Sequence, residues 1–211
     1  RGGEELSIVF PIGKMTLFEY CAQASRRGCA KKFMMTSFEN HLTRKFIGTG
    51  IKARPDRSCA LAFASKEDRL ILASREGFLV NINMEQVGYT AEEVLKLGTT
   101  DHIVSAFILG NKKSVAVVTT NGKVIQRDSG WLEPADTFRT KGQAIFSQSR
   151  REAGIRCAGA AAVDETDLGV LLLSNGEIQV LPMNELLTAG AVSDLEEGIS
   201  VVDFSAFTMP A

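Results

Sequence analysis

The chain has few of the residues on which enzymes most often depend for catalysis or metal binding. Its only histidines, His41 and His102, lie far apart in the sequence, and neither has a second typical metal ligand at close spacing. The sequence contains no G-x-S-x-G, H-E-x-x-H or G-x-x-x-x-G-K-[ST] motif. We therefore predict a non-catalytic domain with no catalytic residues, no cofactor and no metal site.

Cysteines and long apolar runs are also scarce. The four cysteines are Cys21, Cys29, Cys59 and Cys157, and they form no C-x-x-C pair. A chain of 211 residues can bury a core without disulfides, so we expect reduced thiols, as in a cytoplasmic protein. No apolar run approaches the roughly 18 residues that a membrane-spanning helix needs, and the sequence predicts no membrane partner.

The charge of the chain is nearly balanced in total but uneven along its length. The formal net charge is −1, although residues 1–60 hold 11 Lys+Arg against 5 Asp+Glu. Residues 136–163 hold 5 against 2, whereas residues 164–211 hold 9 acidic residues and no Lys or Arg. An asymmetry of this size can create a surface field that the net charge conceals. A positively charged surface on part of the molecule is therefore compatible with the total.

Pairs of apolar runs around a turn glycine recur along the chain. Two of the turns contain Asn-Gly, the strongest short-range hairpin signal, because both residues tolerate positive φ. The pattern occurs at Glu5–Leu17, Asp68–Ile82, Lys113–Arg127 and Asp167–Leu181, with turn glycines Gly13, Gly77, Gly122 and Gly176.

A further apolar strand precedes each of the last three hairpins, at Ser58–Ser65, His102–Leu109 and Arg156–Val163. A unit of several strands with a period of about 40–55 residues indicates a propeller-like array. We predict an all-β domain over residues 1–211 with four blades and repeats at about 1–57, 58–101, 102–155 and 156–198. The remaining strand, at 199–207, is expected to pair with the first hairpin and close the ring, which would hide both sheet edges.

Helical signals are few. Thr90 and Glu93 form a capping-box pattern, which predicts a short helix that runs through Leu97 and ends before Gly98. Met183–Ala189 is expected to add a second helical turn. Both helices would decorate the connections between strands.

Basic residues gather after the first predicted hairpin and again after the third. Cations on successive connections between blades would form a stripe along the rim that neutralises phosphates without reading bases. Gly28, next to Arg26 and Arg27, would let backbone N–H groups approach a phosphate closely. The alternative is that these are ordinary exposed cations. The candidate DNA-binding residues are Arg26, Arg27, Gly28, Lys31, Lys32, Arg44, Lys45, Lys52, Arg54, Arg57, Arg139, Lys141, Arg150 and Arg151.

The repeated strand-plus-hairpin unit resembles the C-terminal domain of the A subunit of bacterial type IIA topoisomerases, gyrase and topoisomerase IV. The resemblance covers nearly the whole chain. It is strongest over His102–Leu181, through DHIVSAFIL, SVAVVTTNGKVIQR, FRTKGQAIF and GVLLLSNGEIQVL. It implies a β-pinwheel, a propeller-shaped disc whose basic rim bends or wraps duplex DNA.

Gyrase members of that family carry a box with the pattern Gln-Arg-Arg-Gly-Gly-Arg/Lys-Gly, required for strong wrapping. In this sequence Arg26, Arg27 and Gly28 match the box in step. The positions that depart from it are Ser25 for Gln, Cys29 for the second Gly, Ala30 for the basic residue and Lys31 for the last Gly. The resemblance therefore implies DNA binding with a degenerate wrapping box.

The function that the resemblance implies is that of a non-catalytic module that bends duplex DNA and presents it to a strand-passage core. Its partners would be double-stranded DNA, largely independent of sequence, the A-subunit core in cis and the B subunit of an ATP-dependent topoisomerase, in the cytoplasm at the bacterial nucleoid. The acidic segment 164–211 predicts that DNA contacts only an arc of the disc. It also supports an alternative, a propeller-like protein-interaction scaffold that has lost strong DNA binding. An enzyme would require a deep pocket with perturbed ionisable groups.

Overall fold

In the computed structural model, which describes residues 17–37, 56–193 and 195–208, antiparallel strands form four sheets. Each sheet, here called a blade, is built on one hairpin. Blades 1 to 4 contain, in order, β1 (Tyr20–Ser25) with β2 (Cys29–Met34), β4 (Arg69–Ser74) with β5 (Phe78–Asn83), β8 (Ser114–Thr119) with β9 (Val124–Asp128), and β12 (Leu168–Leu173) with β13 (Ile178–Pro182). The hairpins expected at 68–82, 113–127 and 167–181 are confirmed. The sequence pattern missed the hairpin of β1 and β2, and the one expected at 5–17 lies, except for Leu17, outside the described residues.

The strand before each hairpin pairs in space with the previous hairpin. In order, β3 (Ser58–Ala64) pairs with β1, β7 (Ile103–Ile108) with β4, and β11 (Cys157–Val163) with β8. The final strand, β14 (Val201–Phe207), completes blade 4 by pairing with β12. The hairpin at 5–17, with which residues 199–207 are expected to pair, lies outside the described residues except for Leu17, so that pairing stays a prediction. In the sequence repeat, each inner strand is grouped with the hairpin that follows it. In the structure, the same strand belongs to the blade of the hairpin before it.

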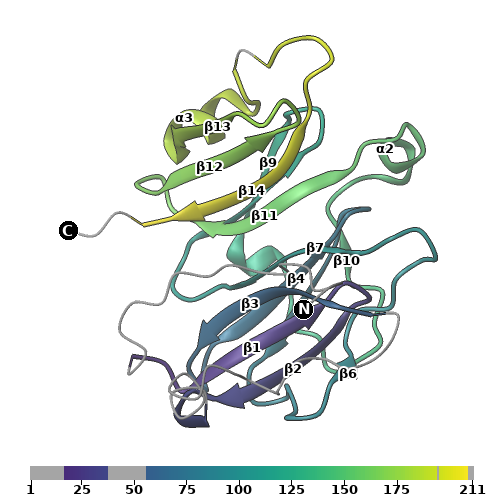
Figure 1. The fold of residues 1–211 in the computed structure, drawn as a ribbon, viewed down its shortest axis with the longest axis vertical. Coiled ribbons are helices and arrows are strands. Elements are labelled where there is room, and N and C mark those ends of the chain that lie inside the picture. Colours follow the sequence, from purple (N-terminus) through teal and green to yellow (C-terminus); the bar gives the residue numbers. More distant parts are fainter. Residues whose placement is uncertain (1–16, 38–55, 194, 209–211) are drawn as a thin grey trace, which may run out of the picture.

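These four strands form the inner layer of the molecule. Consecutive inner strands lie side by side, in the order β3, β7, β11 and β14, and Figure 1 shows β11 and β14 together in the middle of the view. Blades 1 and 2 occupy the lower part of that view and blade 4 the upper part.

The connection after the hairpin of blade 2, 3 or 4 returns to the outer edge of the blade before it. β6 (Glu92–Glu93) pairs with β2, β10 (Gln143–Ala144) pairs with β5, and Ala191 forms a bridge with Lys123, just before β9. The helix expected from Thr90 to Leu97 is therefore wrong. The backbone N–H groups of Val94 and Leu95 donate to the carbonyl of Gly28 at 2.9 and 3.2 Å, and these tertiary bonds outweigh the weak preference of a short isolated helix.

The helices of the described residues are short. The turn expected at 183–189 is confirmed as α3 (Met183–Ala189), which covers blade 4 and ends at Gly190 with φ 64°. A 3₁₀ turn, η2 (Ser129–Trp131), and α2 (Gln148–Glu152) lie on the connection between β9 and β11.

The core lies between the blades. On β4, Leu70 and Leu72 face blade 1, whereas Ile71 and Ala73 face blade 3. The same arrangement on β12 packs Leu171 and Leu173 against blade 3. A strand between two neighbouring blades is buried on both faces, which explains why β4 reads as a near-continuous apolar run.

Candidate nucleic-acid interface

The hairpin turns gather at one end of the blades, here called the turn end. In each blade the first turn residue donates its backbone N–H to the carbonyl just before the inner strand. These bonds join Arg26 to Arg57, Arg75 to His102, Thr120 to Arg156 and Ser174 to Ser200, each at 2.8 Å. The carbonyls of Arg26, Arg75 and Thr120 then accept the N–H groups of Ile103, Cys157 and Val201 in the next blade, at 2.9, 2.7 and 2.9 Å. Each turn is thereby held against its neighbour.

The turn of blade 1 carries the part of the sequence that matches the wrapping box. The carboxylate Oδ1 of Asp56 accepts the N–H of Arg27 at 3.0 Å, and the N–H of Gly28 donates to the carbonyl of Ser25 at 3.1 Å. With the bond from Arg26, all three N–H groups of the matching residues have acceptors within the protein. The expectation that they approach a phosphate is wrong, so contact there falls to the side chains of Arg26 and Arg27, which are exposed.

The two lysines that follow differ in environment. Lys31 is half-buried on β2, whereas Lys32 points to the opposite face and is 6 % exposed. The ammonium of Lys32 donates to the carbonyl of Met84 and lies 4.6 Å from the centre of the Tyr20 ring. Burial lowers the pKa of Lys32. This side chain holds blade 1 to the end of β5, and we leave it out of the interface.

The second group of candidates lies where the sequence placed it, on the connection between β9 and β11. Arg139 pairs with Glu93 of β6 at 2.8 Å, and Arg151 donates to the carbonyl of Phe146 while it lies over the Phe78 ring. Lys141 and Arg150 are exposed, and neither forms an ion pair with any residue that the structure describes. Lys141 and Arg150 are thus the members of this group best placed to bind an anion.

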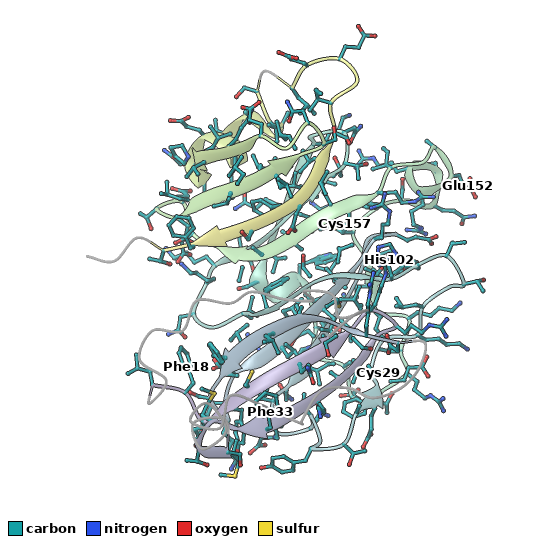
Figure 2. All side chains as sticks on the ribbon, in the orientation of Figure 1. Phe18, Cys29, Phe33, His102, Glu152 and Cys157 are labelled. Carbon is teal, nitrogen blue, oxygen red and sulfur yellow. The ribbon has the colours of Figure 1, made fainter. Side chains whose placement is uncertain are left out.

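The structure brings the two groups to the same end of the molecule. Ile145, just ahead of α2, donates its N–H to Gly77 in the turn of blade 2 at 2.9 Å. Figure 2 shows Cys29, His102 and Glu152 along one edge, with Phe18 and Phe33 at the opposite edge. Arg57, at the start of β3, is exposed at the turn end, whereas the candidates Arg44, Lys45, Lys52 and Arg54 lie outside the described residues.

Sequence reasoning missed two further basic residues at the turn end, Arg75 and His102. Arg75 precedes its turn glycine by two residues, as Arg26 does, and His102 follows an aspartate before an inner strand, as Arg57 does. Aligning the repeats on the turn glycines would have found both. The His102 Nε2 lies 3.5 Å from the Arg26 guanidinium. Burial, with Arg26 and Arg75, lowers the pKa of His102 below its usual value.

Negative charge collects at blade 4. Glu177 follows the turn of that blade, and Glu196 and Glu197 lie on the connection that leads to β14; all three are exposed. The turn end therefore presents cations over blades 1 to 3 and carboxylates over blade 4.

Among the described residues, no three His, Cys, Asp or Glu side chains gather in a way that would hold a metal ion. All four cysteines are free, and burial raises the pKa of Cys21 to about 12. In the same part of the chain, no helix combines the length and apolar character that crossing a bilayer requires.

Comparison with known proteins gives matches in structure alone: no family model and no curated protein matches the chain. A crystal structure of the C-terminal domain of DNA topoisomerase IV matches with a TM-score of 0.72 and 19 % identity, over 94 % of this chain and 65 % of that one. The DNA gyrase A C-terminal domain matches with a TM-score of 0.72 and 17 % identity, over 89 % and 65 %. The E. coli ParC C-terminal domain matches with a TM-score of 0.63 and 10 % identity, over 90 % and 82 %.

The chain thus spans 65 % of the length of the first two of these structures. At these identities the likeness concerns the fold. The likeness in fold agrees with the all-β array of blades that the sequence repeats predict. The protein therefore has the β-pinwheel fold that the C-terminal domains of gyrase A and topoisomerase IV share.

Proposed function

We propose that this domain binds and bends duplex DNA as a non-catalytic part of a type IIA topoisomerase A subunit. The observation that carries the proposal is the set of exposed cations at the turn end of blades 1 to 3, on a fold shared with topoisomerase C-terminal domains. Cations held on a rigid surface neutralise phosphates and release counterions. Strand cutting and ATP use would belong to the rest of the A subunit and to the B subunit, at the bacterial nucleoid.

The contacts in this proposal are made to phosphates, without base readout. Arg27, on the turn of blade 1, and Lys141 and Arg150, on the connection between β9 and β11, are exposed. A duplex that followed all three would cross from blade 1 towards blade 3, and bending it would increase the number of phosphates within reach. The carboxylates of blade 4 would repel the backbone, which limits contact to an arc of the disc.

The test is fluorescence anisotropy with a labelled duplex of about 40 base pairs at several salt concentrations. The variant Arg27→Gln/Lys141→Gln/Arg150→Gln should bind more weakly, and the slope of log K against log salt should fall by up to about 2.7, because each lost contact removes about 0.9. The control is Lys66→Gln/Lys113→Gln, which removes two exposed charges at the opposite end of the blades, and the losses are compared per charge removed. Equal losses in both variants would refute the assignment of the interface.

Bending needs its own measurement. A duplex labelled at both ends should show a shorter end-to-end distance by energy transfer when the domain is bound at low salt. Binding without this change would leave a DNA-binding module and remove the bending role.

The second candidate function is a protein-interaction scaffold, and a specific observation favours it. The outer face of blade 4 exposes Ile178 and Val180 by 65 % and 53 %, beside the acidic side chains of the same blade. Apolar surface of this kind marks protein contacts. Absence of duplex binding even at low salt would favour the scaffold function.

A further inference from the structure

An open cavity of about 650 Å³ lies at the turn end, between the inner strands. Its wall contains residues of all four inner strands, so it opens towards the middle of the array rather than towards the outer edge. Arg26, Arg57, Arg75 and His102 line it, with Asp203 as the carboxylate. Three guanidinium groups and an imidazole thus meet at one opening.

Backbone hydrogen bonds hold together the residues that carry these side chains. Arg26 is hydrogen-bonded through its N–H to Arg57, and Arg75 to His102, both at 2.8 Å. Ile103, next to His102, donates to the carbonyl of Arg26 at 2.9 Å and so joins the two pairs. The side chains converge because the turn residue and the residue before the inner strand are neighbours in every blade.

The carboxylates of Asp101 and Asp203, near the cavity, accept backbone N–H groups. Asp101 accepts the N–H groups of Glu76 and His102 at 3.0 and 2.8 Å. Asp203 accepts the N–H of Phe204 at 2.8 Å, and burial raises its pKa. Among the residues that the structure describes, neither Arg26 nor Arg75 forms an ion pair.

The guanidinium groups of Arg26 and Arg75 meet at one opening without an ion pair among the described residues, an arrangement that an oxyanion stabilises. The Arg26 guanidinium lies 3.5 Å from the His102 imidazole, a distance at which a phosphate could accept from both. Guanidinium groups bind phosphate oxygens in pairs through their planar donors. Val104 and Val202 supply apolar wall beside the cations, and the cavity has the size of a small-molecule site.

We propose that this cavity is a binding site for a phosphate group, held by Arg26, Arg75 and His102 with Arg57 at its edge. The phosphate comes either from a small phosphorylated molecule or from a nucleic-acid backbone, and the two sources present the same chemistry. The site shares Arg26 with the proposed duplex interface but does not use Arg27, Lys141 or Arg150. The two proposals can therefore fail separately.

The test follows the imidazole of His102 by NMR during titration with inorganic phosphate at low salt, the signal being assigned with His102→Gln. Burial and the guanidinium groups of Arg26 and Arg75 lower the pKa of His102, and Asp101 raises it. Bound phosphate should raise this pKa, because it adds negative charge beside the imidazole; Arg57 and Asp203 also line the cavity. Arg75→Gln should weaken phosphate binding by about tenfold or more, since charge-assisted bonds to an anion are lost. Lys113→Gln, an exposed cation at the opposite end of the blades and outside the cavity, should leave phosphate binding unchanged.

The outcomes separate the sources. A response to phosphate that Arg75→Gln abolishes supports the site and a small phosphorylated ligand. A response to the duplex alone, again lost in Arg75→Gln, supports the site with a backbone phosphate as the ligand. No response to either probe, or equal responses in wild type and Arg75→Gln, overturns the proposal. Thermal unfolding of each variant checks that the fold is intact, and calorimetry on His102→Gln gives a second measure of affinity.

Discussion

Gly28 shows why the residue at each hairpin turn is restricted. Its φ is +85°, a region that side chains with a Cβ rarely adopt. A Cβ at this position would also lie 2.3 Å from the carbonyl oxygen of Leu95, far inside van der Waals contact. The turn therefore requires glycine for two reasons, its backbone conformation and the close approach of the outer connection.

We expect Gly28→Ala to lower the free energy of unfolding by more than about 2 kcal/mol. Gly176→Ala should cost only about 1 kcal/mol, because Gly176 has φ +87° but no atom within 4 Å of the place that a Cβ would take. Gly98, which has neither restriction, is the control, and Gly98→Ala should not destabilise. Urea denaturation measures all three, and equal values for Gly28 and Gly176 would show that the contact with Leu95 is unimportant.

Lys32 is a cation that the sequence pattern assigned to DNA and the structure places inside. Its ammonium binds the Met84 carbonyl beside the Tyr20 ring. Because burial lowers its pKa in the folded state, the unfolded chain binds the proton more tightly. The contribution of Lys32 to stability therefore rises with pH in the range just below the ordinary value of 10.5.

We predict that Lys32→Met leaves duplex affinity within about twofold of wild type, because no ion pair with a phosphate is lost. The same substitution should remove the rise in stability just below pH 10.5. Anisotropy and urea denaturation at two pH values test both parts. Arg27→Gln serves as the comparison, since an exposed cation at the turn should weaken binding and leave the pH dependence unchanged.

At the scale of elements, a buried carboxylate ties the start of β12 to its surroundings. Asp167 is 1 % exposed, and both of its oxygens accept from the Lys112 ammonium at 2.8 Å. Thr208, after β14, and the N–H of Asp164 donate to it as well, each at 2.8 Å. Burial alone would raise the pKa of Asp167, but these hydrogen bonds outweigh it and lower the pKa.

Asp167→Asn should destabilise the domain by about 3 kcal/mol at neutral pH, because Lys112 loses its main partner. The carboxylate has a lowered folded-state pKa, so its contribution is present above the unfolded value near 3.8 and is lost as pH falls below it. The variant should therefore lose less stability on acidification than wild type does. Glu165→Gln, at an exposed neighbour, is the control, and an acid transition identical in Asp167→Asn would contradict the role of this network.

At the scale of the whole molecule, the blades are similar but their environments differ. The residue two positions after the turn glycine is 1 % exposed in blade 1 (Ala30), 0 % in blade 2 (Leu79), 8 % in blade 3 (Val124) and 65 % in blade 4 (Ile178). In blades 1 to 3 the next blade covers this position. On blade 4 the same face is apolar and open among the described residues.

This difference in burial predicts that the same substitution will change stability by different amounts in blades 2 and 4. Leu79→Glu should destabilise by more than about 3 kcal/mol, because a charge would enter the contact between blades. Ile178→Glu should change stability by less than about 1 kcal/mol. Thermal unfolding of the pair checks this, and a large loss for Ile178→Glu would mean that its face is covered in the protein in solution.

Much of the fold followed from local pattern. Asn121-Gly122 and Asn175-Gly176 specify hairpins because few other residue pairs adopt the required turn. The hairpin of β1 and β2 was missed because its strands contain alanine, glutamine and lysine instead of a long apolar run. The helix expected from Thr90 failed because a capping pattern describes local preference, whereas the Gly28 carbonyl is a distant partner.

The interface was predicted less completely. Counting cations found Arg26, Arg27 and Arg150 but also Lys32, since the sequence does not say which face of β2 is covered. It missed Arg75 and His102, which are isolated in the sequence and meet Arg26 only when blades 1 and 2 pack together.

The sequence by itself determined the repeat, the hairpin turns and the uneven charge, because turn chemistry and two-residue alternation act over a few neighbouring positions. The tertiary structure decided which hairpin each inner strand joins, which lysine is buried and which cations share a cavity. These depend on hydrogen bonds and contacts between residues far apart in the sequence, such as Arg26 and His102, which are separated by 76 positions. Their energies come from packing one blade on the next, a property that no single repeat contains.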